Sequence, residues 1–335
     1  SFYDSYGNLA ALAAALDVTL QSTDVQASVH SSSTCTSAAA TVANAAGVTG
    51  NSGLYYLGKT ARSFTLTASA SALTSSTAVG TTTAGSSSWF AWTGSTTVSA
   101  AACATLTLSA TDAYANSTVL GAAVPITLAT SSGSSFYLDS LCSGALTSTQ
   151  IASGKASVAV YFKSNTAGTA SVTATASGFA NAEASLTVVP GSAQDLGLSF
   201  GYPLVAGTCN AMTISAVDAY SNLATGSALQ TISLSGGGAT GTFYANSACD
   251  TTASTVGISA GSARSAFYYK TSLTLVSGIT LSSAQLTGTN AAITVFGNVP
   301  TTFALTGSPT LIKNDCGPYT LRVFDTYGNL SFNGC

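Results

Sequence analysis

Cysteines are the residues best suited to chemistry in this chain, because six of the seven recur at a fixed interval. One series is spaced by 107 residues, and the other by 106 and 107 residues. The two series are Cys35, Cys142 and Cys249, and Cys103, Cys209 and Cys316. Thiols can bind zinc or form disulfides, but zinc sites bring thiols or histidines together at short CxxC-like spacings. No such spacing occurs, so the register predicts structural disulfides made in an oxidising compartment.

Two disulfides are predicted within repeats, Cys103–Cys142 and Cys209–Cys249. Each closes a loop of about 40 residues and contributes roughly 4 kcal/mol by restricting the unfolded chain.

The remaining three cysteines have no partner at the same spacing. Cys35 and Cys316 are expected to pair with another subunit or with sequence outside residues 1–335. Cys335 belongs to neither series, and it could pair with Cys316 or cross-link another chain.

A second pattern, Asp-x-Tyr-x-Asn, occurs four times at intervals of 108, 106 and 107 residues. Its copies are Asp4 to Asn8, Asp112 to Asn116, Asp218 to Asn222, and Asp325 to Asn329. Asp and Asn side chains bond to nearby backbone and tolerate left-handed φ, so the motif predicts a structural turn in each repeat. Calcium is the alternative, but a calcium site needs six to eight oxygens and no Asp/Glu cluster lies nearby. The turn is favoured, and no metal or other cofactor is expected.

The residue sets that support catalysis are missing from the sequence. His30 is the single histidine and is expected at a solvent edge. There is no Gly-x-Ser-x-Gly elbow and no phosphate loop ending in Lys-Ser/Thr. Trp89 and Trp92 could form a sugar-stacking surface, although a Trp-x-x-Trp strand more often covers a core or a domain junction. The chain is therefore predicted not to be an enzyme.

Charge is unusually sparse, since Asp, Glu, Lys and Arg make up 6% of the chain where soluble proteins average roughly 25%. The formal net charge is −3 and no basic cluster occurs, which argues against nucleic acid as a partner. No apolar run approaches the roughly 18–20 residues that span a bilayer. An uncharged, hydroxyl-rich surface offers little repulsion between copies and suits dense lateral packing.

The repeat of about 107 residues organises the whole chain. Within it, short segments alternate apolar and hydroxyl residues, as Leu106 and Leu108 do in residues 103–113. About seven such strands fit in one repeat, and the predicted fold class is all-β, with tandem immunoglobulin-like antiparallel sandwiches. The predicted divisions are 1–83, a sandwich without its first strands; 84–190 and 191–299, two whole sandwiches; and 300–335, the opening strands of a further sandwich.

This pattern resembles bacterial immunoglobulin-like repeats, which occur in large bacterial surface and secreted proteins. The residues that carry the resemblance are Cys209, Asp218 to Asn222, Phe243 and Tyr244, Cys249, Gly261, and Phe267 to Lys270. The chain looks like a two-cysteine version of these repeats along its whole length. The resemblance implies a sandwich fold and an extracellular or cell-surface location, and it says little about the biological role because sandwiches host many functions.

Near-uniform repeats and low charge favour a structural protein of an extracellular filament, stalk or cell-surface fibre. One alternative is an adhesin or carbohydrate-binding array, with a ligand at loops that differ between repeats, such as residues 74–88. Another is a set of non-catalytic repeats attached to an enzyme.

The two ends of the array are complementary, since residues 300–335 contain the strands that residues 1–83 lack. One hypothesis is a head-to-tail fibre in which these strands complete the next subunit's sandwich and Cys316 pairs with Cys35. The alternative is one continuous polypeptide with further repeats. Residues 1–14 duplicate 322–335, which a simple donor scheme does not need. The expected partners are copies of the chain, head-to-tail or lateral, or further repeats of it, with glycans or a host or cell surface as candidate ligands.

Overall fold

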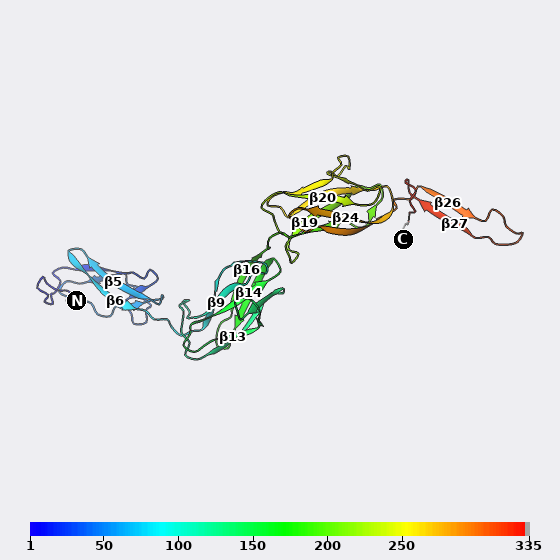
Figure 1. Cartoon of the computed structure of the whole chain (residues 1–335). Coiled ribbons are helices and arrows are strands. Elements are labelled where there is room, and N and C mark those ends of the chain that lie inside the picture. Colours follow the sequence, from blue (N-terminus) through cyan, green and yellow to red (C-terminus); the bar gives the residue numbers. More distant parts are fainter. Residues whose placement is uncertain (332–335) are drawn as a thin grey trace. The chain divides into compact units, whose positions relative to one another are not determined.

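The computed structural model describes residues 1–331 (Figure 1). Its strands are short because turns of serine, threonine and glycine interrupt the chain often. All regular secondary structure in that range is β. No helix with the length and hydropathy of a membrane span occurs among these residues.

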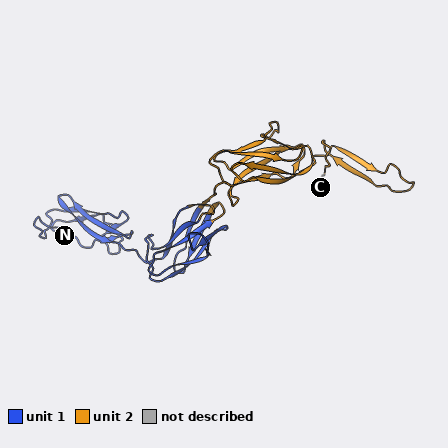
Figure 2. Ribbon diagram, viewed as in Figure 1, with its two compact units in different colours: residues 1–96, 103–163, 170–186 blue, residues 97–102, 164–169, 187–335 orange. Residues whose placement is uncertain are grey.

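The chain divides into two compact units (Figure 2). The first unit comprises residues 1–96, 103–163 and 170–186, and the second comprises residues 97–102, 164–169 and 187–335. The boundary passes through the second predicted sandwich, whose segments 97–102 and 164–169 belong with the third repeat.

The first repeat forms a four-stranded sheet in the order β3-β1-β5-β6 and a two-stranded sheet, β2-β4. Its strands are β1 (Leu16–Ser22), β2 (Ser28–His30), β3 (Thr41–Asn44), β4 (Tyr55–Leu57), β5 (Ser63–Ala70) and β6 (Leu73–Thr81).

The second repeat forms two five-stranded sheets, β12-β11-β14-β9-β7 and β13-β10-β15-β16-β8. Its strands are β7 (Trp89–Gly94), β8 (Thr97–Ser99), β9 (Ala104–Thr111), β10 (Val124–Thr130), β11 (Ser134–Tyr137), β12 (Ala145–Leu146), β13 (Ser148–Ile151), β14 (Ser157–Ser164), β15 (Gly168–Thr175) and β16 (Ala182–Val189). The additional strands beyond the predicted seven are pieces of two to four residues, too short to show alternation in the sequence.

The strand order of the second repeat is that of an immunoglobulin-like sandwich. Strands β7, β9, β14 and β11 occupy the A, B, E and D positions of one sheet, and β10, β15 and β16 occupy the C, F and G positions of the other. Strand β8 extends the second sheet at the A′ position, where it pairs in parallel with β16.

The third repeat has the same plan, with sheets β17-β19-β23-β21 and β18-β25-β24-β20-β22. Its strands are β17 (Asp195–Phe200), β18 (Leu204–Val205), β19 (Asn210–Val217), β20 (Gln230–Gly236), β21 (Thr242–Tyr244), β22 (Thr255–Ile258), β23 (Arg264–Lys270), β24 (Leu275–Ser283) and β25 (Thr289–Phe296). Strand β18 again pairs in parallel with β25. A separate hairpin follows, formed by β26 (Thr302–Gly307) and β27 (Tyr319–Phe324).

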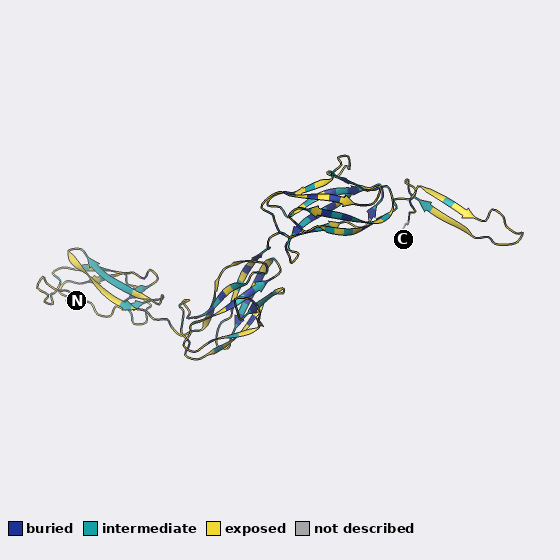
Figure 3. Cartoon of the chain, in the orientation of Figure 1, coloured by how far each residue is buried: buried dark blue, intermediate teal, exposed yellow. Residues whose placement is uncertain are grey.

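Alternation of apolar and hydroxyl residues places the core between the two sheets. In β9, for example, Leu106 and Leu108 are buried while the intervening Thr107 is only partly covered. Figure 3 shows the difference between repeats: buried residues fill the second and third sandwiches, whereas the first repeat and the hairpin are mostly intermediate or exposed. In the first repeat the buried apolar side chains are Leu20 and Val29.

The equivalent positions Leu108 and Leu321 provide a test of this difference. Leu108 is fully buried, whereas Leu321 is 62% exposed. We expect Leu108→Ala to lower the free energy of unfolding of the second repeat by about 2–5 kcal/mol. Leu321→Ala should leave the stability of the second repeat unchanged. Both tryptophans lie in the second repeat, so a urea titration followed by tryptophan fluorescence reports that repeat alone. Equal midpoints for the two variants would contradict the assigned core.

Candidate functional site: the repeat junctions and the cysteines

The motif of residues 112–116 is a closed turn. The Asp112 N–H donates to the Asn116 carbonyl (3.0 Å), and the Ala115 N–H donates to the Asp112 carbonyl (3.1 Å). Carboxylate oxygen Oδ1 of Asp112 accepts the N–H groups of Tyr114 (2.9 Å) and Asn116 (3.0 Å). Ala115 has a left-handed φ of 64°. Two other copies of the motif have glycine at this position, Gly7 and Gly328, which adopts the conformation without strain.

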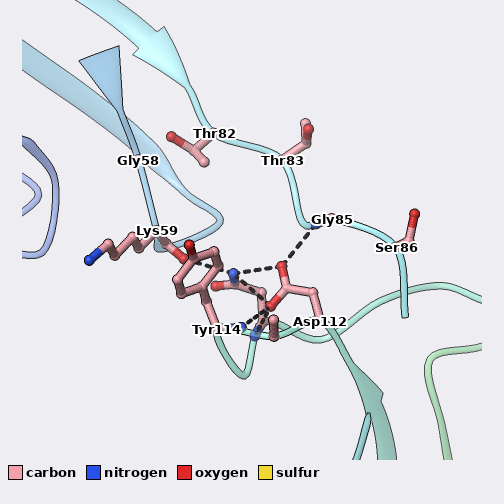
Figure 4. A pocket seen from close by; sticks show the side chains of 10 residues that line it. Gly58, Lys59, Thr82, Thr83, Gly85, Ser86, Asp112 and Tyr114 are labelled. Atoms are coloured by element: carbon pink, nitrogen blue, oxygen red, sulfur yellow. Dashed lines mark hydrogen bonds between the residues drawn. The ribbon is translucent and has the colours of Figure 1, made fainter. Parts of the chain in front are cut away.

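Two further sets of hydrogen bonds extend beyond the turn (Figure 4). Oδ2 of Asp112 accepts the N–H of Gly85, in the linker before β7 (2.9 Å). The Asn116 side chain donates from Nδ2 to the Lys59 carbonyl (2.8 Å) and accepts at Oδ1 from the Ala61 N–H (2.8 Å). The motif thus bonds both the linker and a loop of the preceding repeat. We call this set of bonds the junction clasp.

The junction clasp recurs with the same atoms in the next two copies of the motif. In one, Asp218 accepts from Gly191 N–H (2.8 Å), and Asn222 bonds the Asn165 carbonyl (2.8 Å) and the Ala167 N–H (2.8 Å). In the other, Asp325 accepts from Asn298 N–H (2.9 Å), and Asn329 bonds the Ser272 carbonyl (2.7 Å) and the Thr274 N–H (3.0 Å).

The first copy of the motif forms the turn without the clasp. Within the described chain, the Asp4 carboxylate accepts the N–H groups of Tyr6 and Asn8 and the Asn8 side-chain amide. Asp4 and Asn8 are exposed, whereas Asp112, Asp218 and Asp325 are buried. The sequence predicted the four turns, but it did not show that three of them bond a preceding repeat.

Donated N–H groups control the ionisation of the clasp carboxylates. Burial alone would raise the pKa of Asp112, but hydrogen bonds from Asn116, Gly85 and Tyr114 outweigh it and lower the pKa to about 2. The pKa values of Asp218 and Asp325 are lowered by the same balance. Because both oxygens of each carboxylate are already engaged by N–H donors, the arrangement favours a structural role over cation binding. Among residues 1–331, no three His, Cys, Asp or Glu side chains cluster at metal-binding distance.

A pocket of about 260 Å³ lies beside the first clasp (Figure 4). Lys59, Thr82, Gly85, Asp112 and Tyr114 are among its lining residues, and the Lys59 ammonium lies 5.9 Å from the centre of the Tyr114 ring.

The structure joins both cysteine pairs expected within repeats, Cys103–Cys142 and Cys209–Cys249. Cys35 and Cys316 are free thiols, half-buried and exposed respectively. Cys335 lies outside the described residues.

Cys35 nevertheless has the local conformation of its bonded counterparts. Its φ is 52°, against 51° for both Cys142 and Cys249. In each case the cysteine N–H donates to the carbonyl three residues earlier, at 2.9 Å for Cys35 and 3.0 and 3.1 Å for the other two. Cys35 therefore lies in the same type of turn as the two bonded cysteines, although its own thiol is free.

The structure speaks against the stacking surface, the less favoured interpretation of the two tryptophans, and it contradicts the expectation for His30. Trp89 and Trp92 do not form one stacking surface, because residues three apart on a strand point to opposite faces. Trp89 is 50% exposed, whereas Trp92 stacks on Phe136 with ring centres 5.7 Å apart. His30 is not at the solvent edge: it is buried in β2, and its Nε2 lies 2.7 Å from Ser28 Oγ. That expectation was wrong because both Val29 and His30 are buried in β2, so neither face of this short strand is open to solvent at these residues.

Comparisons with known proteins leave the function open. No protein-family model matches the chain, and no curated protein matches it. Among solved structures, the bacterial integrin-binding protein invasin is 12% identical with a TM-score of 0.32, over 73% of this chain and 48% of that one. The chain thus spans about half of the invasin chain.

Two further solved structures show similar values. The Escherichia coli adhesin FdeC is 17% identical with a TM-score of 0.34, over 74% of this chain and 77% of that one. A glycosyl hydrolase family 2 member from Bacteroides cellulosilyticus is 14% identical with a TM-score of 0.28, over 58% of this chain and 23% of that one. Similarities of this size, to an adhesin and to a hydrolase alike, assign no role.

The lowered pKa of Asp112 predicts a pH-dependent stability. A carboxyl group whose pKa is lower in the folded state stabilises the fold above its ordinary pKa of 3.8, and the contribution is lost as pH falls towards about 2. We expect Asp112→Asn to lower the free energy of unfolding by about 1–3 kcal/mol at pH 7, because an amide NH2 group would then face N–H donors that need an acceptor. The wild-type and variant urea midpoints, followed by tryptophan fluorescence, should converge between pH 4 and pH 2.

Glu183→Gln is the matched control for this experiment. Glu183 lies exposed on β16 in the same repeat, so the variant loses one negative charge without touching the clasp. An equal effect of the two substitutions at pH 7 would show that net charge, rather than the clasp, stabilises the repeat.

Proposed function

We propose that this chain is a structural protein: a run of disulfide-stapled immunoglobulin-like repeats within an extracellular filament, stalk or cell-surface fibre. The observation that carries the proposal is the recurrence of the junction clasp. Three successive copies of the motif bond the linker through Asp and a loop of the preceding repeat through Asn. A protein that only had to present one binding domain would not need the same restraint at every linker.

The disulfides support a mechanical role in an oxidising location. Cys103–Cys142 and Cys209–Cys249 each enclose a segment that contains strands of the core. When a sandwich is pulled from its ends, the enclosed segment cannot extend until the disulfide is reduced. Structural disulfides of this kind persist outside the reducing cytosol, in agreement with a secreted or surface protein.

The surface suits close packing of many copies. Charged residues are 6% of the chain and the formal net charge is −3. Like-charge repulsion between neighbouring copies is therefore small, and hydroxyl groups supply most of the surface polarity.

Immunoelectron microscopy of the source cells, with antibodies against this chain, tests the proposal. A structural role gives label along the length of filaments or stalks. Label confined to filament tips, together with saturable binding of the purified chain on a glycan array, would replace the proposal with the adhesin alternative.

Single-molecule stretching of the full chain provides a mechanical prediction. The disulfides join residues 39 and 40 positions apart, so reduction should lengthen the unfolding step of the second and third repeats by ~130 Å each, at ~3.4 Å per residue. A Cys103→Ser, Cys142→Ser double variant should show the longer step for the second repeat without reductant. Steps of equal length before and after reduction would show that the disulfides do not keep the enclosed segments from extending.

A further inference from the structure

The first repeat and the terminal hairpin are complementary in strand content. Residues 1–83 contain counterparts of the C, D, E, F and G strands, and residues 302–324 contain counterparts of A and B. The hairpin also has the register of the complete sandwiches: Thr302 pairs with Phe324 as Asp195 pairs with Val217, and the match continues to Gly307 and Tyr319. The hairpin is thus an A–B pair folded in advance.

Apolar side chains that are buried in the complete sandwiches are exposed on residues 302–324. Leu196 is 5% exposed and Leu204 is 1% exposed, whereas their counterparts Phe303 and Leu311 are 74% and 53% exposed. Met212 and Ile214, both fully buried, correspond to Tyr319 and Leu321, which are 52% and 62% exposed. Leu311 occupies the A′ position, between the two strands of the hairpin.

The first repeat has free strand edges at the matching places. Strand β6 is at the end of its sheet and is exposed along most of its length, whereas its counterparts β16 and β25 each carry an A′ strand in parallel. Strand β4 pairs only with β2 among the described strands, whereas its counterparts β14 and β23 also pair with a B strand.

We propose that the open sandwich of residues 1–83 is completed by residues 302–324 of a second copy of this chain. The inference rests on the proposed structural role and names its partner. Phe303, Leu311, Tyr319 and Leu321 enter the space between the two sheets of the first repeat, and residues 310–312 pair with β6. The donated strand β27 pairs with β4 and brings Cys316 to Cys35.

A disulfide then fixes the joint. The thiols of Cys316 and Cys35 lose two protons and two electrons as their sulfur–sulfur bond forms, and a low-molecular-weight disulfide accepts the electrons and is reduced to two thiols. Cys35 already has the φ of Cys142 and Cys249, the counterparts that are joined in disulfides.

Docking exchanges one segment for another. In the described structure the Phe2 N–H donates to the Thr49 carbonyl (2.8 Å), as Ala216 N–H does to Ala263 (2.9 Å). Val323 is the counterpart of Ala216, so in the docked state the N–H of Val323 from the incoming copy donates to the Thr49 carbonyl in place of Phe2. Residues 1–8 form an exposed motif without a clasp, whereas Asp325 is clasped to its own linker.

Two variants that are complementary in their cysteines test the proposal, both in a Cys335→Ser background. Copies with Cys35→Ser keep Cys316, and copies with Cys316→Ser keep Cys35. Mixed under a glutathione redox buffer, they should form a heterodimer on a non-reducing gel, with a Cys316–Cys35 linkage in peptide mapping, while each alone stays monomeric. A mixture that remains monomeric, or that links Cys316 to Cys316, would overturn the proposal.

Leu311→Asp in the Cys316-containing copy separates strand docking from chance thiol contact. Leu311 is exposed in the single chain, so the substitution should leave its fold intact, yet it should reduce heterodimer at least about tenfold by placing a carboxylate in the core. Thr306→Asp is the matched control, since its counterparts Thr93 and Ser199 are exposed. Equal yields for both variants would exclude docking by A′ strand insertion. If antibodies label filaments in microscopy but the mixed variants form no disulfide, the structural role is supported and a second copy is excluded as the partner of the first repeat.

Discussion

The repeat junctions depend on one interaction, the acceptance of N–H groups by a buried aspartate carboxylate. At Asp112 the donors come from its own turn and from the linker at Gly85. A carboxylate buried without such donors would be costly and would take up a proton. Here the donors are strong enough to lower the pKa to about 2. Displacing the linker would take the Gly85 N–H away from a buried, ionised carboxylate, so the linker and the turn of the following sandwich are coupled through Asp112.

This interaction explains why the motif repeats while the residues it bonds do not. The partners of the clasp are backbone groups: the N–H of Gly85, Gly191 or Asn298, and the carbonyl of Lys59, Asn165 or Ser272. Any non-proline residue supplies a backbone N–H, and any residue supplies a carbonyl. Only the carboxylate and the side-chain amide have to come from particular residue types.

For the same reason, the sequence predicts the turns but not their partners. The period, the alternation around Leu106 and Leu108 and the cysteine register are encoded in side chains, so the all-β sandwich fold could be derived from them. The clasp joins Asn116 to backbone atoms 55 and 57 residues away, which leave no pattern in the sequence. Trp89 and Trp92 are different, since strand parity alone would have separated them. The burial of His30 could not be predicted in this way, because Val29 and His30 are both buried and the three residues of β2 show no alternation.

The clasp also determines which hydrogen bonds would hold a junction between two copies of the chain. Asp325 and Asn329 bond the linker at Asn298 and the loop at Ser272, so the root of the terminal hairpin is already held to the third repeat by a complete clasp. Any sandwich built on that hairpin would follow the third repeat through the same hydrogen bonds that precede the second and third. A junction between copies would then use the same hydrogen bonds as a junction within one chain, because all of the clasp residues belong to the copy that donates the hairpin.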